Sequence, residues 1–391
     1  MKKIGILCFA SKKEGGIYQY TQSMVDALLL DKTNRYIIIT SKNNTDYDNK
    51  DVDLIKDNTN IDNPFLKIST FWVSILGFKS LFSRKKRKLY ESFDLLVLPV
   101  ISLYPVCWIN IPYIITIHDL QEKYFPQYFT LSQKIYRAFS RKISALQSSH
   151  IICESNYVKN DIIKYLKVQP SKISVIQSPP LLASNHGDNN EKYLKEIKNR
   201  YLLPERYILY PAQFWHHKNH MKLLEAFSIL TQKYSDMHLV FTGGDISARH
   251  EVFKSHNGSA VMEKVKKLNC SQNIHFLGYV DYTDLSGVYI LSEMLVVPTL
   301  FESVSLPIYE AFYLGVPVCA SNVVALPEQV GNAGLLFNPY NPQDMADKMI
   351  EILENRDLKQ RCIENGMKRI QELNTDSYSK SLVNIINEYT N

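Results

Sequence analysis

Short apolar segments alternate along this chain with segments of helical periodicity, and the alternation comes in two series. Each apolar segment suits one buried strand, and each helical segment is long enough to cross back over a sheet. This pattern is typical of parallel α/β sheets. The first series predicts strands at Lys3–Phe9, Arg35–Thr40, Phe93–Val100, Tyr113–Ile117, His150–Glu154 and Lys172–Gln177, with helices at Tyr18–Leu30, Leu131–Gln147 and Tyr157–Leu166.

The alternation stops at residues 181–206, where small and polar residues lead into a charged stretch without a strand. Such a composition is typical of a linker or hinge. The second series predicts strands at Tyr207–Pro211, Leu239–Thr242, Ile274–Leu277, Glu293–Pro298, Val316–Ala320 and Leu335–Phe337, with helices at His220–Tyr234, Gly258–Leu268, Tyr282–Leu291, Leu306–Leu314 and Pro342–Leu353.

We therefore predict an α/β protein with two Rossmann-like domains that face each other across a cleft. The predicted parts are a domain at 1–180, the hinge at 181–206, a domain at 207–373 and a C-terminal helix at 374–391 that packs back on the first domain. Ligands of such sheets bind beyond the carboxyl ends of the strands, so the cleft is the expected site.

Charge is distributed unevenly between the two series. Residues 1–180 hold 25 Lys and Arg against 15 Asp and Glu, a net charge of +10, whereas residues 181–391 carry −4. A basic half favours nucleic acid, an anionic membrane surface or a phosphorylated substrate as partner.

Several classes of protein are excluded by missing motifs. The chain has no G-x-G-x-x-G after its first strand, no G-x-x-x-x-G-K-[ST], no H-E-x-x-H and no G-x-S-x-G. A conventional NAD enzyme, P-loop NTPase, zincin or α/β-hydrolase is therefore not expected. The six cysteines are never closer than 43 residues, which excludes a C-x-x-C centre and favours a reducing compartment.

No signal peptide is recognisable at the N-terminus, so we expect a cytoplasmic protein. The segment Leu95–Ile117 is uncharged over 23 residues, which is long enough to span a bilayer. It contains three prolines, and we expect two strand segments around a turn there rather than a spanning helix.

Two glycines separate the first predicted strand from its helix. Gly15 and Gly16 let the backbone approach a ligand closely, with the free amides and the positive end of the helix dipole facing it. An ordinary flexible turn between strand and helix is the alternative interpretation.

A second loop of this kind runs from Glu302 to Glu310. Pro307 suits the first turn of the following helix and Ser305 its N-cap, which places Glu302 on the loop and Glu310 about one turn into the helix. The two carboxylates are candidates to hold sugar hydroxyls; stabilisation of the helix dipole is the alternative for Glu302. The backbone amides expected to face a diphosphate are those of Ser303, Val304, Ser305 and Leu306.

A third loop, Pro211–His220, follows the first strand of the second series. Lys218 is a candidate to bind a phosphate through charge-assisted bonds of roughly 1.5–3 kcal/mol each. A metal bound by His216, His217 and His220 is the alternative, but no carboxylate lies nearby in sequence to complete such a site, and we expect no metal.

His118 and Asp119 end a predicted strand of the first series. A histidine at this place can donate a hydrogen bond or carry a proton near neutral pH, which makes His118 a candidate catalytic residue. A polar cap on the strand is the alternative.

Taken in order, these loops resemble the family-four retaining glycosyltransferases of the GT-B fold, over nearly the whole chain. The matching motifs are Glu302-x7-Glu310 for E-x7-E, Ala311–Val318 for the A-x-x-x-G-x-P-V that follows it, Pro327–Phe337 for P-E-x-x-G-x-A-G-L-L-F, Gly15-Gly16 for the glycine loop and His118-Asp119 for the strand-end histidine.

The resemblance implies that the first domain binds an acceptor and the second a nucleotide sugar, with a UDP- or GDP-sugar most expected. Glu302 would bind the donor sugar, Glu310 the ribose, and Lys218 the diphosphate, together with the loop amides. Gly16 and His118 would reach the cleft from the other domain. The family needs no metal, so cations and helix dipoles would stabilise the departing nucleoside diphosphate.

Two departures from the family pattern stand out. Gln213 occupies the place of the family's usual arginine, and Arg249 or Lys254 is a candidate to replace that cation. Ser303 and Ser305 stand where glycines are common, which keeps the amides but restricts φ.

An aromatic, amphipathic segment precedes a cationic run in the first domain. On a helical wheel Lys67, Thr70 and Ser74 lie opposite the apolar half, whose members are Phe65, Ile68, Phe71, Trp72, Ile75, Leu76, Phe78 and Phe82. We expect this apolar half, with Phe71, Trp72 and Phe78, to contact a membrane. An ordinary core helix, which shows the same periodicity, is the alternative.

The cationic run suits anionic lipid, at about 1 kcal/mol per cation near the surface. We therefore expect a peripheral protein on the inner face of the cell membrane with a lipid-linked or membrane-displayed glycan acceptor, and no nucleic acid. The run consists of Arg84, Lys85, Lys86, Arg87 and Lys88.

Two further functions stay open. One is a GT-B nucleotide-sugar epimerase or phosphorylase, which uses the same donor site without an acceptor glycan. The other is a catalytically silent GT-B protein that binds glycan or scaffolds a complex, an interpretation that Gln213 keeps open.

Overall fold

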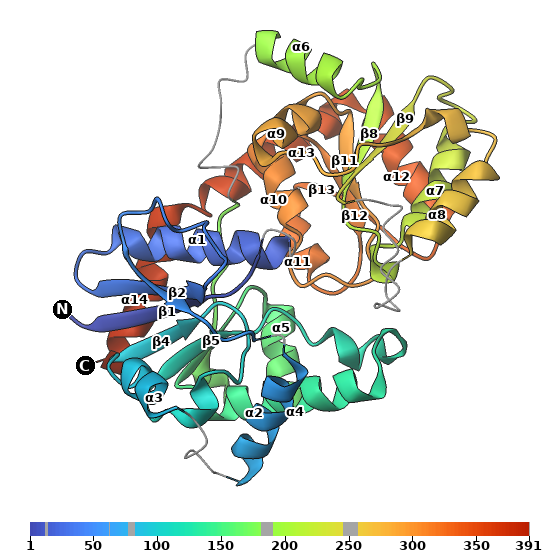
Figure 1. Cartoon of the computed structure of the whole chain (residues 1–391). Helices are drawn as coiled ribbons and strands as arrows, with labels where there is room; N and C mark the ends of the chain where they lie inside the picture. The colour runs from blue at the N-terminus through green and yellow to red at the C-terminus, as the bar shows by residue number, and fades with distance from the viewer. Residues whose placement is uncertain (12–14, 62, 77–82, 181–190, 245–256, 391) are drawn as a thin grey trace. The chain divides into compact units, whose positions relative to one another are not determined.

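The computed structural model describes residues 1–11, 15–61, 63–76, 83–180, 191–244 and 257–390. The chain divides into two compact units (Figure 1). Unit 1 comprises Met1–Pro179 together with Leu373–Asn391, and unit 2 comprises Pro180–Glu372. Each unit contains one parallel β-sheet.

Unit 1 contains a seven-stranded parallel sheet in the order β3-β2-β1-β4-β5-β6-β7. The sequence analysis did not predict β3, a short strand with an acidic residue at each end. The strands are β1 (Lys3–Cys8), β2 (Arg35–Ser41), β3 (Asp53–Asp57), β4 (Leu95–Leu98), β5 (Tyr113–Thr116), β6 (His150–Cys153) and β7 (Ile173–Val175).

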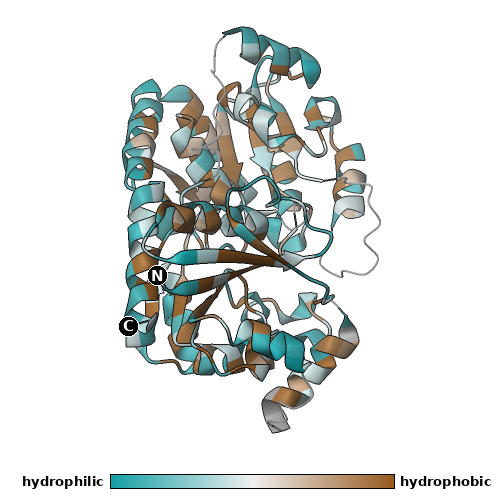
Figure 2. Ribbon diagram, turned by 60° about the vertical axis from the view of Figure 1, so that its left-hand side comes forward, coloured by the Kyte–Doolittle hydropathy of each residue, from teal (hydrophilic) through white to brown (hydrophobic). Residues whose placement is uncertain are grey.

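Side chains alternate along these strands between two buried faces, so most residues of the central strands are apolar (Figure 2). Ile4 and Ile6 point to the face covered by α1 (Gly16–Leu30) and α14 (Thr375–Thr390), where Met24 and Leu382 belong to the same cluster. This cluster joins the two ends of the chain in one core.

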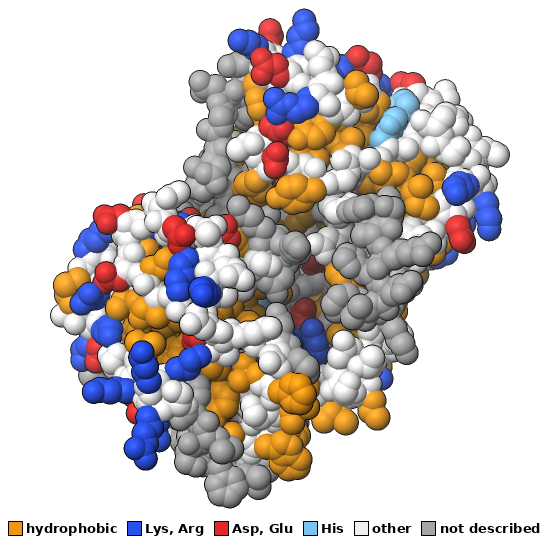
Figure 3. Space-filling model, viewed as in Figure 1, with side chains coloured by type: hydrophobic (Ala, Val, Ile, Leu, Met, Phe, Trp, Pro, Cys, Tyr) orange, Lys and Arg blue, Asp and Glu red, His pale blue; other side chains and the backbone are white. Residues whose placement is uncertain are grey.

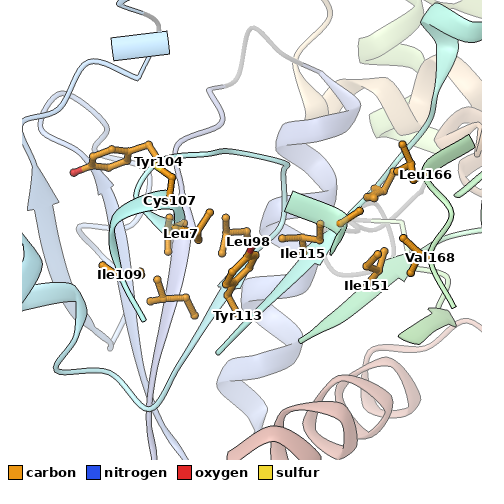
Figure 4. Close-up of a cluster of buried hydrophobic side chains, with 14 of the residues drawn as sticks. Leu7, Leu98, Tyr104, Cys107, Ile109, Tyr113, Ile115, Ile151, Leu166 and Val168 are labelled. Carbon is orange, nitrogen blue, oxygen red and sulfur yellow. The ribbon is translucent and has the colours of Figure 1, made fainter. Parts of the chain in front are cut away.

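The opposite face of the same sheet carries a second cluster, which includes Leu7, Leu98, Ile115 and Ile151 (Figure 4). The helices on this part of unit 1 each contribute to it. They are α2 (Pro64–Leu76), α3 (Arg84–Tyr90), α4 (Leu131–Gln147) and α5 (Asn156–Asp161), with the short helices η3 (Val106–Trp108), η4 (Gln121–Lys123), η5 (Pro126–Tyr128), η6 (Ile162–Leu166) and η7 (Pro170–Lys172) between strands.

The segment Leu95–Ile117 forms β4, η3 and β5, as its prolines indicated. Nowhere in the described ranges is there a helix whose length and apolar character would let it cross a bilayer.

Unit 2 contains a six-stranded parallel sheet in the order β10-β9-β8-β11-β12-β13. Its strands agree with the prediction to within two residues at either end. They are β8 (Tyr207–Pro211), β9 (His238–Thr242), β10 (Ile274–Phe276), β11 (Met294–Val297), β12 (Val318–Ser321) and β13 (Gly334–Phe337).

The helices of unit 2 differ from the prediction at the N-terminal end of the unit. Within the expected hinge at 181–206, residues Glu191–Arg200 form α6, which packs on α9 through Ile197 and Gly287. The tail forms two helices, α13 in unit 2 and α14 in unit 1. The helices of unit 2 are α6, α7 (His220–Leu230), α8 (Gly258–Lys266), α9 (Tyr282–Ile290), α10 (Leu306–Tyr313), α11 (Leu326–Val330), α12 (Pro342–Glu354) and α13 (Arg356–Gln371), with η9 (His216–Lys218) and η10 (Ser271–Asn273).

Candidate active site

An ion pair joins two of the predicted loops of unit 2. Strands β8 and β11 are neighbours in the sheet, so the loops that leave their carboxyl ends lie side by side. One loop carries Lys218 and the other Glu302. The Lys218 Nζ lies 2.7 Å from Oε1 and 2.6 Å from Oε2 of Glu302. Both side chains are largely buried, at 19% and 15% exposure, yet each keeps some contact with solvent.

Asn219, which the sequence analysis did not single out, fixes both loops. Its side-chain amide donates to the carbonyl oxygens of Pro298 and Pro339, each at 2.9 Å, and so joins the segments after β8, β11 and β13. Asn219 has φ of +60°, a conformation that Asn tolerates better than most residues. An Asn just before a predicted helix was the signal that could have revealed this role.

The start of α10 is held by Gln329 of α11, also missed in the sequence. The Ser305 amide donates to Gln329 Oε1 at 2.9 Å, and Gln329 Nε2 donates back to the Ser305 carbonyl at 2.8 Å. Ser305 occupies the predicted N-cap position, although its side chain makes no capping bond. The expectation that its amide faces a diphosphate is wrong, because that amide already donates to Gln329. For the amides of Ser303, Val304 and Leu306, no acceptor is found among the residues that the structure describes.

Glu310 lies on α10 and is only 3% exposed. Tyr289 donates to its Oε2 at 2.6 Å, and the Tyr282 hydroxyl lies 3.5 Å from Oε1; both tyrosines belong to α9. Burial raises the pKa of Glu310 to about 7, and the two tyrosine hydroxyls act in the opposite direction by stabilising the carboxylate. Glu310 is thus a carboxyl group that changes charge near neutral pH.

Gln213, in the place of the family's arginine, accepts a hydrogen bond from Trp215 Nε1 at 2.6 Å. The two candidates to replace that arginine, Arg249 and Lys254, lie outside the described residues.

The histidines of the Pro211–His220 loop do not converge. The His220 ring is buried against Tyr210, Phe214 and Phe241, with ring centroids 4.6–5.4 Å apart. Throughout the described ranges, no three His, Cys, Asp or Glu side chains gather in a way that could hold a metal ion. His220 is thus a core residue.

In unit 1, the glycine loop leads directly into α1. Gly15 has φ of 58° and ψ of −115°, a conformation that side-chain-bearing residues adopt only with strain, and α1 begins at Gly16. Tyr20, one turn further along α1, contacts the ring of His118 edge-on at 4.6 Å. The glycine loop and His118 are therefore close together at the carboxyl edge of the unit 1 sheet.

His118 follows β5, and both of its ring nitrogens have partners. Nδ1 lies 3.1 Å from Oε2 of Glu154, and Nε2 lies 3.0 Å from the Pro99 carbonyl oxygen. The next residue, Asp119, is bound by Arg141 of α4 at 3.2 Å. Glu154 was missed because a carboxylate after a buried strand has no distinctive sequence pattern.

Helix α2 exposes its apolar side chains. Phe65, Ile68 and Trp72 are 80%, 56% and 53% exposed. Thr70, which the helical wheel placed opposite the apolar half, is buried, and so is Val73: the helix turns these two side chains inward. Tertiary packing, which the wheel does not include, decides which face is inward.

Phe71 is half-buried and packs on Phe139 of α4, with ring centroids 4.3 Å apart. Phe78, also predicted to contact membrane, lies outside the described residues. On α4 itself, Leu131 and Ile135 are exposed, so hydrophobic side chains gather over the region where Figure 1 draws α2 and α4 (Figure 3).

The cationic run forms α3, where Figure 3 shows a concentration of Lys and Arg. Two of its members have intramolecular partners. Lys86 donates to the buried carboxylate of Asp57 at 2.9 Å, and Arg87 pairs with Glu91 at 2.9 Å. Arg84, Lys85 and Lys88 are exposed, and no ion pair to a described residue involves them.

Comparison with known proteins agrees with these two Rossmann-like units. A model of "Glycosyltransferase Family 4" matches residues 15–180, and one of "Glycosyl transferases group 1" matches residues 194–369. Anabaena HepE in complex with UDP-glucose superposes with a TM-score of 0.75 over 99% of this chain and 100% of that one, at 13% identity. The protein thus has the GT-B fold of glycosyltransferases.

The chain belongs to the family-four glycosyltransferases. Two of its relatives are named as O-antigen chain mannosyltransferases. The O-antigen chain mannosyltransferase B of Escherichia coli is 23% identical over 270 residues, which cover 69% of this chain and 68% of the relative. The O-antigen chain mannosyltransferase RfbU of Salmonella typhimurium is 27% identical over 225 residues, which cover 58% of this chain and 56% of the relative.

Proposed function

We propose that the protein is a retaining glycosyltransferase that moves a hexose-type sugar from a nucleotide sugar to a glycan acceptor. The observation that carries the proposal is the Lys218–Glu302 pair, which two neighbouring strands of unit 2 bring to the carboxyl edge of the sheet. This edge is where parallel sheets bind nucleotides. A cation and a carboxylate held there suit a diphosphate and a sugar hydroxyl, respectively.

In this proposal Lys218 binds the diphosphate of the donor, with the Ser303, Val304 and Leu306 amides at the positive end of α10. Glu302 accepts hydrogen bonds from donor sugar hydroxyls. Because Lys218 rests on Glu302, the arriving diphosphate meets a cation whose position is already fixed, which limits the reorganisation needed in the transition state.

Glu310 is proposed to accept from the ribose hydroxyls. Its carboxylate is already oriented by Tyr289, and the low exposure at this position makes each hydrogen bond to a charged acceptor stronger than in water. In unit 1, Gly15, Gly16 and His118 are proposed to serve the same reaction, since they share one edge of that sheet.

The reaction is proposed to proceed on one face of the sugar without a metal. The bond between the anomeric carbon and the diphosphate oxygen breaks, the acceptor hydroxyl oxygen forms the new bond on the same face, and the departing phosphate takes the hydroxyl proton. Lys218 and the α10 amides stabilise the negative charge that develops on the phosphate.

The donor is proposed to be a UDP- or GDP-sugar. The UDP-glucose complex of Anabaena HepE supports a nucleotide sugar, and the mannosyltransferase names of the two relatives support a hexose. Those relatives are named for O-antigen chains, which supports a surface polysaccharide precursor as acceptor here.

The acceptor is proposed to be lipid-linked or displayed on a membrane, with the protein bound peripherally to the inner face of the cell membrane. The exposed Phe65, Ile68 and Trp72 support this, because a water-facing helix surface of this kind is unfavourable unless something covers it. Exposed cations on α3 complement an anionic lipid headgroup. A bilayer satisfies both requirements at once.

The test begins with thermal unfolding of the protein in a panel of UDP-, GDP- and ADP-sugars, followed by transfer assays on membrane lipid fractions with the stabilising donor. We expect one nucleotide class to raise the melting temperature and to yield a glycosylated lipid product with the anomeric configuration of the donor. Inversion would contradict the retaining mechanism. Interconversion of the nucleotide sugar without acceptor would indicate an epimerase, and absence of any donor effect would indicate a silent binding protein.

A further inference from the structure

A buried carboxylate outside the proposed donor site, that of Glu154, contacts the ring of His118. Glu154 follows β6 and is only 6% exposed. Its Oε2 faces His118 Nδ1 at 3.1 Å, and its Oε1 accepts a hydrogen bond from the Ser178 hydroxyl at 3.1 Å. The other ring nitrogen of His118 faces the Pro99 carbonyl at 3.0 Å.

These contacts fix how many protons the imidazole carries. A peptide carbonyl can only accept a hydrogen bond, so the nitrogen facing Pro99 must carry a proton. An ionised carboxylate can likewise only accept, so the nitrogen facing Glu154 must carry the second. Both contacts are satisfied at once by an imidazolium next to a carboxylate.

The remaining surroundings of His118 agree with a charged ring. Asp119 adds negative charge from the same loop, although Arg141 of α4 partly neutralises it. On the α1 side, Tyr20 directs its hydroxyl to Thr116 at 3.0 Å, and its high pKa keeps it neutral. Tyr378 of α14 lies behind Tyr20 and is equally neutral. Burial lowers the pKa of His118, but the hydrogen bond and charge of Glu154, together with the charge of Asp119 and the Pro99 carbonyl, raise it above its usual value.

We infer that Glu154 is a positioning residue that keeps His118 doubly protonated, so that His118 serves glycosyl transfer as a fixed positive charge and not as a proton acceptor. The inference rests on the proposed function for the reaction itself. Neither ring nitrogen has a free lone pair, so His118 cannot take the proton of an acceptor hydroxyl while these contacts persist. A fixed cation instead stabilises negative charge, such as that of a departing phosphate.

The substitution Glu154→Gln tests whether Glu154 keeps His118 doubly protonated, because glutamine has the shape of glutamate without its charge. A glutamine amide can donate to Nδ1, so a neutral ring with its proton on Nε2 satisfies both contacts in the variant. In ¹⁵N-histidine NMR of the full chain at about pH 7.5, with the His118 signals assigned by His118→Asn, we expect both nitrogens of the wild-type ring to be protonated. In Glu154→Gln we expect Nδ1 to be unprotonated.

The matched control is Ser178→Ala, which removes the partner of the other Glu154 oxygen and leaves the carboxylate in place. His118 should stay doubly protonated in this variant. An unprotonated ring nitrogen in the wild type, which would mean that Glu154 holds the proton, overturns the inference, as does an unchanged ring in Glu154→Gln. This measurement does not use transferase activity, so it stands even if the proposed reaction is wrong.

Kinetics with the donor found in the panel give the second readout. We expect kcat of Glu154→Gln to be on the order of 10-fold to 100-fold below wild type at about pH 8, the range of a lost electrostatic contact. The deficit should shrink as the pH falls through about 6.5, the ordinary pKa of histidine, because the ring regains its charge. A merely structural defect would lower kcat equally at every pH, and that result would contradict the inference.

Discussion

Lys218 and Glu302 lie 84 residues apart in the chain, yet the ammonium group of one contacts both carboxylate oxygens of the other. They meet because β8 and β11 are adjacent in the sheet, although the strands β9 and β10 and the helices α7, α8 and α9 lie between them in sequence. The pair gives the carboxyl edge of unit 2 a fixed cation and a fixed acceptor.

Replacement Lys218→Ala should weaken donor binding by about 10-fold to 100-fold, as expected for a lost charge-assisted bond of roughly 1.5–3 kcal/mol. The measurement is calorimetric titration with the stabilising nucleotide sugar. The matched control is Lys222→Ala on α7, which removes a lysine that pairs with Glu225 on the helix surface. Equal donor affinity in the Lys218 and Lys222 variants would contradict the assignment.

The double variant Lys218→Ala/Glu302→Gln should recover part of the affinity for the nucleoside diphosphate alone. In the single Lys218 variant, the Glu302 carboxylate is left unpaired and repels the diphosphate; the glutamine removes that repulsion. Sugar transfer should stay low in the double variant, since the proposed contact to the donor sugar is also lost. Strictly additive effects on diphosphate affinity would show that the two residues act independently.

Replacement Asn219→Ala should lower the unfolding free energy of unit 2 by about 2–4 kcal/mol. It leaves the buried carbonyls of Pro298 and Pro339 without donors, at about 1–3 kcal/mol each, and puts alanine at positive φ. Asn219→Gly should be less damaging, because glycine accepts that backbone conformation. Chemical denaturation measures both, with Asn365→Ala as control, since that exposed amide makes a single bond to the Asn332 carbonyl.

Glu310 should make the protein less stable as the pH rises toward neutrality, whereas most carboxylates make a folded protein more stable as the pH rises. Its pKa of about 7 in the folded state lies above the ordinary 4.5, so the folded state holds the proton more tightly. The stabilisation is fully present below about pH 4.5 and is lost as the pH rises to about 7, by up to about 3 kcal/mol. The comparison is wild type against Glu310→Gln, unfolded at about pH 5 and pH 8. The variant should gain relative stability at the higher pH.

Donor affinity should change in the other direction with pH if Glu310 binds the ribose. The ionised carboxylate accepts from the ribose hydroxyls, so donor binding to the wild type should strengthen as the pH rises through about 7 and should be flat in Glu310→Gln. Tyr289→Phe removes a donor to the carboxylate, which should shift both transitions to higher pH. A donor affinity that ignores pH in the wild type would argue against this contact.

Binding to anionic vesicles should depend on both halves of the surface formed by α2 and α3. The variant Phe65→Ser/Ile68→Ser/Trp72→Ser should lose at least about tenfold in vesicle affinity, given about 1.5–3 kcal/mol for each fully buried apolar side chain. The measurement is flotation with vesicles of phosphatidylglycerol. Tyr279→Ser/Tyr340→Ser, which removes exposed rings from unit 2, is the matched control and should float like the wild type.

The cations contribute separately. Arg84→Gln/Lys85→Gln/Lys88→Gln should weaken binding by about 1 kcal/mol per charge and should flatten its dependence on salt. Lys86 is left in place because it pairs with the buried Asp57 carboxylate. Its replacement would remove a contact that holds α3 on unit 1, so the result would not report on lipid binding alone. Equal binding to neutral phosphatidylcholine vesicles would show that charge plays no part.

Helices and strands that leave a periodic pattern in their own residues were predictable from the sequence. The β-strands of unit 2 and helix Leu131–Gln147 are examples, because a buried strand or an amphipathic helix leaves a periodic pattern. The short strand Asp53–Asp57 was missed, since it is half charged and pairs on one side only. Helix α6 was missed because a charged segment between two domains has the composition of a linker.

Most residues of the candidate site were predictable from the sequence, but the contacts between their side chains were not. Lys218 and Glu302 were each singled out, while their contact depends on a strand order that no local pattern records. Gln329 contacts Ser305, and Glu154 contacts His118, each on another element of the fold. No residue adjacent in sequence therefore indicates the role of Gln329 or Glu154. Which face of α2 is buried could not be predicted for the same reason, because a helical wheel carries no information about the neighbouring α4.

Helix α14 has a consequence for the order in which the molecule can be made. Its residues Tyr378, Leu382, Ile385 and Ile386 complete the core beneath α1, so unit 1 receives its last layer only after the whole of unit 2 has been synthesised. During translation, the first 179 residues lack the part of their core that α14 supplies, whereas unit 2 has all of its own strands and helices once residue 372 has been added. Synthesis from N- to C-terminus and completion of the folded units therefore run in opposite orders in this chain.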